Sequence, residues 1–192
     1  MASPQGPWQT DEMHVLTPHP TTGSTTVDRI EVEIERLGEA GLKLRYQVFG
    51  DLTRLKAADL ERAGRADGLW RSTCFEAFVK PEGGEGYLEF NFAGLQWAAY
   101  RFVGYREGMA AAAVEPGVIE GSLRDGSLSV EIEPGRMARP DLPAPAWRIG
   151  LSAVIEDIDG GISYWALAHP SAKPDFHHPD SFALVLPAPE AP

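Results

Sequence analysis

Short runs in which apolar and polar residues alternate follow one another along most of this chain. In residues 27–36, for example, Ile30, Val32 and Ile34 alternate with glutamates. Successive side chains of a strand point to opposite faces, so this period predicts a strand with one buried face and one wet face. Comparable runs, most of them bounded by turn residues, cover residues 42–48, 74–79, 87–92, 98–103, 118–123, 127–133, 147–155, 162–168 and 182–186.

The spacing of these runs predicts an all-β protein. Nine or ten short strands, with one short helix over residues 52–63, are typical of an antiparallel β-sandwich. The chain has 192 residues and 43% of them are hydrophobic, which is enough for one domain with its own core. We expect the sandwich over residues 26–187 and a flexible tail over residues 188–192. Residues 1–25 are rich in Pro, Thr, Gly and Ser and are expected to form a loosely packed or disordered leader.

Charge and cysteine content narrow the classes of function. With 28 acidic and 17 basic residues the net charge is −11, which disfavours nucleic acid and anionic membrane surfaces as partners. The single cysteine, Cys74, excludes an internal disulfide and is expected to be a buried, inert thiol. The first residues contain no apolar segment behind a positive charge, and no apolar run is long enough to span a membrane. We therefore expect a cytoplasmic protein, whose oligomeric state the sequence does not fix.

Residues 69–105 carry many ionisable groups inside predicted strands, where such groups are costly unless they are paired or functional. With a turn over residues 93–97, Glu89 lies opposite Arg101, which is a favourable cross-strand pair. A shorter turn would move Arg101 to the apolar face beside Phe90, where an unpaired charge is costly. We therefore expect Glu89 and Arg101 to be neighbours, either as a solvated ion pair or as ligand contacts.

Enzyme motifs are mostly absent. The chain has no nucleophile elbow, no phosphate-binding glycine loop and no paired-cysteine metal site. Residues 168–182 concentrate His and Asp, which bind metals, but in proline-rich loops such groups often hydrogen-bond the backbone, so we assign no metal site. Glu76 and Glu89 are candidates for the carboxylate pair of a glycoside hydrolase. Nothing favours a catalytic role over a ligand-holding one, and no residue is assigned as catalytic.

Aromatic residues beside polar strand positions suit a sugar ligand. A sugar ring has an apolar face that stacks on indole, and its hydroxyls need both donors and acceptors. Trp147 is expected to pack in the core. Trp70 lies at a strand entrance, and Trp165 shares strand parity with Ser163 rather than with its immediate neighbours. Both of these tryptophans are therefore expected on an accessible face.

Three segments resemble the DOMON superfamily, and especially its branch similar to family 9 carbohydrate-binding modules. They are LWRSTCFEAFV, YLEFNFAGLQWAAYRF and YWALAHPSAKPDFHHPDSFALVLP. The resemblance implies an immunoglobulin-like β-sandwich that binds sugars in some members and haem in others. It implies that Trp70 and Trp165 clamp a terminal sugar, with Glu76 six residues after Trp70 and Arg101 on the neighbouring strand. Thr73 stands where those modules often have Asp, which bears on any calcium contact there.

The strand geometry sets a condition on such a clamp. Six residues of extended strand span about 20 Å, too far for Trp70 and Glu76 to contact one sugar. Residues 71–73 must therefore bend back if both side chains touch the same ligand.

We predict a non-catalytic domain that binds a small carbohydrate or a sugar-like metabolite. One alternative is a haem-binding DOMON domain, for which Met109 with His169 or His177 are the candidate axial ligands. Another is a glycoside-processing enzyme. The predicted ligand-binding residues are Trp70, Glu76, Glu89, Asn91, Arg101, Trp165 and His177.

Overall fold

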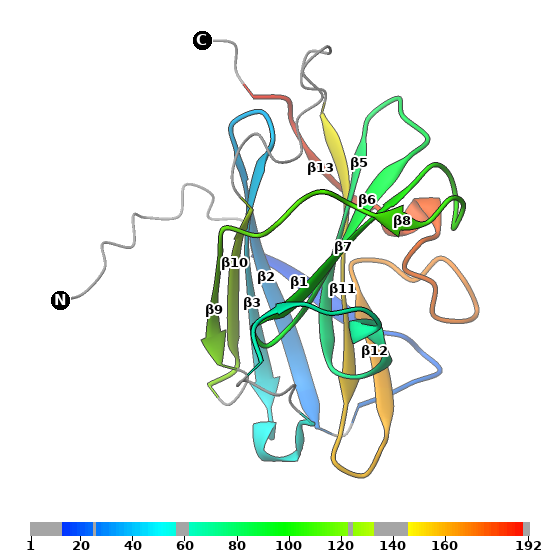
Figure 1. Cartoon of the computed structure of the whole chain (residues 1–192). Coiled ribbons are helices and arrows are strands. Elements are labelled where there is room, and N and C mark those ends of the chain that lie inside the picture. The colour runs from blue at the N-terminus through cyan, green and yellow to red at the C-terminus, as the bar shows by residue number, and fades with distance from the viewer. Residues whose placement is uncertain (1–12, 25, 57–61, 123–124, 133–145, 190–192) are drawn as a thin grey trace, which may run out of the picture.

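A computed structural model describes residues 13–24, 26–56, 62–122, 125–132 and 146–189 of the chain (Figure 1). Within these ranges the protein is all-β and has no α-helix, only the 3-10 turns η1 (Leu52–Arg54), η2 (Leu69–Arg71) and η3 (Pro179–Ser181). The strands are β1 (Met13–Pro18), β2 (Val27–Leu37), β3 (Gly41–Gly50), β4 (Gly64–Arg65), β5 (Cys74–Pro81), β6 (Tyr87–Ala93), β7 (Gln96–Phe102), β8 (Ala110–Ala111), β9 (Val118–Ser122), β10 (Ser127–Ile132), β11 (Trp147–Glu156), β12 (Ile162–Ala166) and β13 (Leu184–Leu186).

All thirteen of these strands belong to one mixed sheet. Eleven of them follow the order β4-β7-β6-β5-β11-β12-β1-β2-β3-β10-β9, while β13 pairs with β11 and β8 with β7. β4 runs parallel to β7, so the predicted purely antiparallel arrangement is wrong at this edge. The prediction of nine or ten strands missed β1, β4 and β8, of which β4 and β8 are only two residues long.

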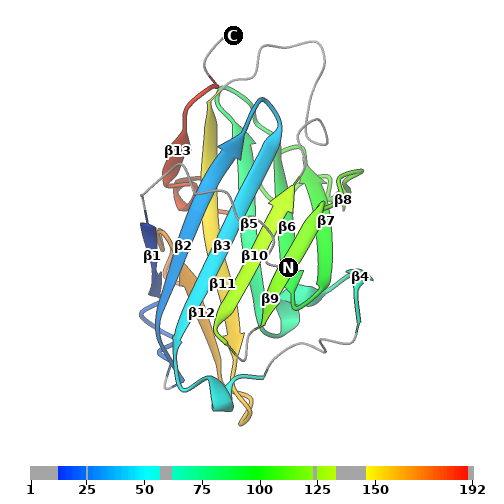
Figure 2. The same ribbon diagram turned by 90° about the vertical axis from the view of Figure 1, so that its left-hand side faces the viewer.

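The sheet curls until its two halves face each other, as the two views show (Figures 1 and 2). β2, β3, β10 and β9 make up one half, and β12, β11, β5, β6 and β7 make up the other. Between the halves, the hydroxyl of Tyr46 on β3 donates a 2.7 Å hydrogen bond to the carbonyl of Glu76 on β5. The largest fully buried side chains of this core are Leu16, Ile30, Leu42, Leu44, Tyr46, Phe75, Phe90, Phe92 and Ile149.

β1 joins the two halves of the sheet. Its first four residues pair with β2, and Thr17 and Pro18 pair with β12. Leu16 points into the core between two exposed neighbours, Val15 and Thr17, which fixes the register of this strand. The prediction of a loosely packed leader is therefore wrong for residues 13–18, whereas residues 1–12 lie outside the described part of the chain.

The short helix expected over residues 52–63 is replaced by η1. The carboxylate of Asp51 caps this turn by accepting hydrogen bonds from the backbone N–H and the hydroxyl of Thr53. Leu55 then forms an isolated bridge with Asp157, and residues 57–61 lie outside the described ranges.

The β6–β7 hairpin has a tight turn of two residues, Gly94 and Leu95, because Ala93 pairs directly with Gln96. Gly94 has a φ of 60°, which suits glycine at the first central position of a two-residue hairpin turn. With this shorter turn Leu88, and not Glu89, lies opposite Arg101, so the predicted cross-strand pair is wrong. Arg101 avoids the cost of burial because its side chain lies exposed near the end of its strand.

The outer face of β5, β6 and β7, which points away from the core, carries a second apolar cluster. Phe78, Tyr87, Tyr100 and Phe102 come from the strands, and Phe182 comes from a covering segment, residues 167–183, that follows β12. The rings meet edge-on or tilted, apart from the stacked pair of Tyr87 and Phe102. This packing holds the covering segment over the sheet and leaves space beside it.

Candidate functional site

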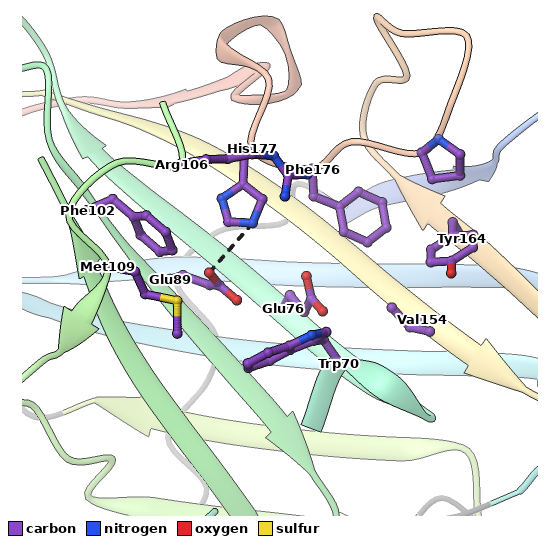
Figure 3. A pocket seen from close by; sticks show the side chains of 11 residues that line it. Trp70, Glu76, Glu89, Phe102, Arg106, Met109, Val154, Tyr164, Phe176 and His177 are labelled. Carbon is purple, nitrogen blue, oxygen red and sulfur yellow. Dashed lines mark ion pairs between the residues drawn. The ribbon is translucent and has the colours of Figure 1, made fainter. Parts of the chain in front are cut away.

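A pocket of about 350 Å³ lies on this outer face, between the strands and the covering segment (Figure 3). Glu76 on β5, Glu89 on β6, Val154 on β11 and Tyr164 on β12 line it from the sheet, and strand pairing places all four on one face. The other lining residues are Trp70, Phe102, Arg106, Met109, Pro174, Phe176 and His177.

Two glutamates form the inner wall of the pocket. Glu76 pairs in register with Asn91, two residues along β6 from Glu89, so the two carboxyl groups are diagonal neighbours on one face. The hydroxyl of Ser152 donates a long, 3.4 Å hydrogen bond to Glu76, and the side-chain amide of Asn91 donates a 2.7 Å bond to Glu89. Asn91 is itself held by the thiol of Cys74, which donates to its oxygen over 3.7 Å. Asn91 and Cys74 therefore orient Glu89 from behind.

Burial raises the pKa of both carboxyl groups. Glu76 is only 3% exposed, and desolvation raises its pKa well above the ordinary value, with a further contribution from the charge of Glu89. Desolvation also raises the pKa of Glu89, against the hydrogen bond from Asn91 and the charge of Arg106, which act to lower it. Two neighbouring buried carboxyl groups resist double ionisation, so the pair tends to retain a proton.

Trp70 lies in η2, immediately before β5. The preceding Gly68 has a φ of 79°, a left-handed conformation that glycine adopts at little cost. The turn bends the chain between Trp70 and Glu76, so that both side chains line one pocket, as the length argument requires. The indole is half-buried and meets the ring of Tyr100 edge-on, with 5.7 Å between ring centroids.

His177 approaches the carboxyl pair from the covering segment. Its Nε2 lies 3.8 Å from a carboxylate oxygen of Glu89, which is too long for a hydrogen bond (Figure 3). Its Nδ1 lies 2.8 Å from the hydroxyl of Tyr87, and that oxygen accepts the backbone N–H of Arg106. Burial, aided by the charge of Arg106, lowers the pKa of His177 to about 4, so the ring is neutral near neutral pH. If Tyr87 donates to Nδ1, the proton of this neutral ring resides on Nε2 and faces the pocket.

Asp175 ties the covering segment to the loop after β7. Its carboxylate accepts hydrogen bonds from Tyr105 at 2.6 Å, from the guanidinium of Arg106 at 2.7 Å and from the backbone N–H of His177 at 3.1 Å. Burial acts to raise the pKa of Asp175, but these bonds and the charge of Arg106 together lower it. Arg106 has a φ of 55°, which is uncommon for a residue other than glycine. Its backbone N–H bonds the hydroxyl of Tyr87 and its guanidinium bonds Asp175, so the residue is anchored through both backbone and side chain.

The structure thus gathers Trp70, Glu76, Glu89 and His177, four of the predicted ligand-binding residues, around one pocket. Asn91 is fully buried behind this wall, where it supports Glu89.

Trp165 and Arg101 do not reach the pocket. Trp165 is 3% exposed and belongs to the core between the halves, where its indole nitrogen donates a 3.0 Å bond to the hydroxyl of Ser163. The predicted clamp of two facing tryptophans is therefore wrong. Its neighbour Tyr164 occupies the opposite side of β12 and lines the pocket instead. Arg101 lies on the core side of β7, beyond the edge of the core.

Several pocket residues escaped the sequence analysis because no periodicity places them. Arg106 lies in the loop after β7, and Pro174 and Phe176 lie in the covering segment. Met109, in the same loop as Arg106, was named only as a candidate haem ligand. Tyr164 is the exception. Because it follows Ser163 on β12, it points to the opposite face of the sheet, and this alternation could have predicted its place in the pocket.

The described residues contain no group of three or more His, Cys, Asp or Glu side chains able to hold a metal ion. Two histidines of residues 168–182 bond the backbone instead: His169 through the carbonyl of Thr17 and His178 through the N–H of Asp180. The hydroxyl of Thr73, considered for calcium, is bonded to the backbone of Glu156.

Met109 and His177, two of the candidate axial ligands for haem, both line the pocket. Nδ1 of His177 is engaged by Tyr87, and Nε2 has the carboxylate of Glu89 only 3.8 Å away. Nδ1 is therefore not free to bind iron, and a pocket of about 350 Å³, at the lower end for small-molecule sites, is small for a porphyrin. These residues do not fit haem.

No protein-family model matches this chain, and a search of curated proteins gives no match. Among solved structures, the chain is similar to a crystal structure from Bacteroides uniformis ATCC 8492 described as a "putative carbohydrate-binding protein". The TM-score is 0.60 at 18% sequence identity, and the match covers 88% of this chain and 83% of the other. This similarity shows a shared fold. No helix within the described ranges is long and apolar enough to cross a membrane.

Proposed function

We propose that this chain is a non-catalytic binding domain for a small carbohydrate or a sugar-like metabolite. The observation that carries the proposal is the position of the Trp70 indole beside the buried pair of Glu76 and Glu89 in one pocket. The indole offers an apolar face for a sugar ring, and the carboxyl groups accept hydrogen bonds from hydroxyls. A volume of about 350 Å³ is at the lower end for small-molecule sites and suits a mono- or disaccharide.

The opposite side of the pocket supplies hydrogen-bond donors. A neutral His177 with its proton on Nε2 presents one donor, and the guanidinium of Arg106 presents others. Sugar hydroxyls donate and accept at once, so a pocket with carboxyl acceptors on one wall and donors on the other matches their chemistry. Tyr164 and Phe176 add apolar surface at the side.

The arrangement of the carboxyl groups supports binding over glycoside hydrolysis. Glycosidases generally place an acid and a second carboxylate on either side of the scissile bond, with their pKa values pushed apart. Here Glu76 and Glu89 lie side by side on one wall, and the pKa of each is raised (Figure 3).

The structural similarity supports the same proposal, since the similar protein is described as a "putative carbohydrate-binding protein". We extend the proposal to kinship with the DOMON superfamily and to an immunoglobulin-like sandwich. The support for this extension is the pair of facing sheet halves and the place of Trp70 ahead of the strand that carries Glu76.

Calorimetric titration with a panel of mono- and disaccharides tests the proposal. We expect at least one sugar to bind with a dissociation constant in the micromolar to millimolar range, and Trp70→Ala to abolish that binding. Arg101→Ala serves as the matched control and leaves binding unchanged, because Arg101 lies on the other face of the sheet. A complete absence of affinity at millimolar sugar across the panel would overturn the proposal.

A further inference from the structure

We propose that the ligand of this pocket carries a protonated amine, which binds between the carboxyl groups of Glu76 and Glu89. This inference rests on the proposed carbohydrate function, and together the two identify the ligand class as amino sugars. Three features of the pocket carry the inference: a carboxyl oxygen without a protein donor, a local excess of negative charge, and aromatic walls.

The first feature is the incomplete set of partners around Glu76. This side chain is 97% buried, yet its Oε2 receives only the 3.4 Å bond from Ser152. Among the described residues none donates a hydrogen bond to its Oε1. Both glutamates line the pocket, so their free acceptors are directed toward a ligand. A largely desolvated carboxylate with few protein donors costs free energy, which a ligand that donates hydrogen bonds would recover.

The second feature is the charge around the pair. From the sheet, the groups that face it are Asn91, Ser152 and the neutral thiol of Cys74, whose pKa burial raises. The hydroxyl of Tyr46, behind Glu76, is neutral as well, since burial raises its pKa far above 10.0. None of these groups supplies a positive charge.

The covering segment supplies no positive charge, and the loop after β7 supplies only that of Arg106. His177 is neutral near neutral pH, and Tyr87 beside it keeps its proton because burial raises its pKa. Arg106 acts to lower the pKa of Glu89, but its guanidinium is half exposed and already bonded to Asp175, so it offsets the charge of the pair only in part. The ion pair with Asp175 takes up part of the charge of Arg106. One partly engaged arginine stands against two carboxylates, so ionisation of both Glu76 and Glu89 leaves a net negative site that a cationic ligand would neutralise.

The third feature is the set of rings around this site. Trp70, Phe102, Tyr164 and Phe176 all line the pocket. A cation beside aromatic faces gains cation–π attraction, most of all beside indole. An ammonium group also has three donors, which match the free oxygens of two carboxylates. A neutral hydroxyl in the same place would recover neither the charge nor the third donor.

Amine binding has a proton signature. Both carboxyl groups have raised pKa values in the empty pocket, and a bound cation favours their ionised forms. Binding of a protonated amine therefore releases protons, and its affinity rises with pH until the amine itself loses its proton. Binding of a neutral sugar has no such requirement.

The test compares three forms of the same sugar by calorimetry near neutral pH. Glucosamine, galactosamine and mannosamine are each titrated beside the parent hexose and the N-acetylated form, in two buffers that differ in ionisation enthalpy. We expect one amino sugar to bind at least about tenfold tighter than its parent hexose, with proton release, because charge-assisted hydrogen bonds are the stronger ones. The N-acetylated form, which lacks the charge, binds no tighter than the parent. Equal affinity for the hexose and its amino form would overturn the amine inference and leave the carbohydrate proposal standing.

Ethanolamine is an amine without a sugar ring, so its binding tests the carbohydrate proposal independently of the amine inference. Binding of ethanolamine as tight as that of the best amino sugar would support the amine site and overturn the carbohydrate proposal. Absence of binding by all of these compounds would overturn both.

Conservative variants test whether Glu76 and Glu89 are the residues that produce the preference for an amine. Glu76→Gln and Glu89→Gln keep the shape of the wall but remove a charge each, so each is expected to reduce the preference for the amine over the parent hexose to below about threefold. Glu85→Gln is the matched control, since Glu85 lies exposed in the loop between β5 and β6. It should retain the full preference. An undiminished preference in a folded Glu76→Gln and Glu89→Gln double variant, with folding checked by its thermal melt, would overturn the inference.

Discussion

The hydroxyl of Tyr87 on β6 lies 2.8 Å from Nδ1 of His177, a residue 90 positions later in the chain. Through this contact the rigid sheet fixes the orientation of a ring that belongs to the covering segment. The same hydroxyl accepts the backbone N–H of Arg106, so one strand residue organises both loops that close the pocket. Side chains held in this way lose little conformational entropy when a ligand binds.

Removal of that hydroxyl tests how much the pocket depends on it. Tyr87→Phe leaves the ring packed against Phe102 but frees Nδ1 of His177 and the N–H of Arg106. We expect sugar affinity to fall about fivefold, because the loss of one such hydrogen bond is worth about 1 kcal/mol. Titration calorimetry measures the affinity, and nitrogen chemical shifts of His177 report whether one tautomer still dominates. Unchanged affinity together with an unchanged tautomer would show that the ring is fixed by packing alone.

The two tryptophans once expected to act together should now separate in their effects. Trp70 is half-buried in the pocket wall, so Trp70→Ala is expected to abolish sugar binding while lowering stability by about 1 kcal/mol. Trp165 is packed between the sheet halves, so Trp165→Ala is expected to cost about 3–5 kcal/mol through lost burial and a cavity. Urea unfolding of both variants measures the difference. A large loss of stability in Trp70→Ala would identify that indole as a core residue and weaken the case for stacking.

Two arginines, five positions apart, form a second matched pair. Arg106 lines the pocket and bonds Asp175, whereas Arg101 is exposed on the other face of β7. Arg106→Ala is expected to weaken sugar binding by about tenfold, because a donor is lost and the loop after β7 is released from Asp175. Its effect on stability is expected to stay below about 1 kcal/mol, as for other partly exposed ion pairs.

Arg101→Ala is the control for this comparison, and we expect its affinity to stay within about twofold of the unaltered protein. Equal losses in the two variants would mean that net charge, and not contact with the ligand, determines binding.

The strands were predictable because their side chains alternate, but the way they pair was not. Whether Glu89 or Leu88 faces Arg101 depends on a turn that differs in length between the two registers. Charge pairing favoured the longer turn, while the glycine at Gly94 favoured a two-residue one. The glycine prevailed because an arginine near a strand end can leave the core and so avoids the expected penalty.

Trp165 shows a related limit of pattern analysis. Trp165 does lie on the same face of β12 as Ser163, as predicted. The prediction failed because the serine was assumed to mark the solvent-exposed face. The hydroxyl of Ser163 is buried and satisfied by the indole N–H, so this polar residue lies inside. The candidate site was predictable where the strands carry it, at Glu76 and Glu89. Arg106 and Phe176 arrive on loops, and only the tertiary fold places them.

The carboxyl pair should make the empty protein less stable as pH rises. The folded pKa of Glu76 is raised above its unfolded value of 4.5, chiefly by desolvation and next by Glu89, so the folded state retains a proton that the unfolded state has lost. Stability is then highest below the unfolded pKa and falls as pH rises toward the folded one. Glu76→Gln cannot ionise, and we expect it to be more stable than the unaltered protein at neutral pH and less dependent on pH. Thermal melts over a pH series measure both, and a less stable variant at neutral pH would show that the carboxyl group is ionised and well paired in the folded state.

His177 should have the opposite effect on the pH dependence of stability, and at lower pH: its contribution to stability is lost as pH falls. Its pKa falls from 6.5 in the unfolded chain to about 4 in the folded protein, mainly through burial and then through the charge of Arg106. Between these values the unfolded state binds more protons, so the stability contributed by a neutral His177 is complete above about pH 6.5 and is lost as pH falls toward 4. A shift of this size corresponds to about 3 kcal/mol. His177→Asn keeps an acceptor near Nδ1 for Tyr87 but does not titrate, so its urea-unfolding free energy should lack this loss. Parallel curves for the two proteins from neutral pH to about pH 4 would show that His177 titrates normally and is open to solvent in the folded protein.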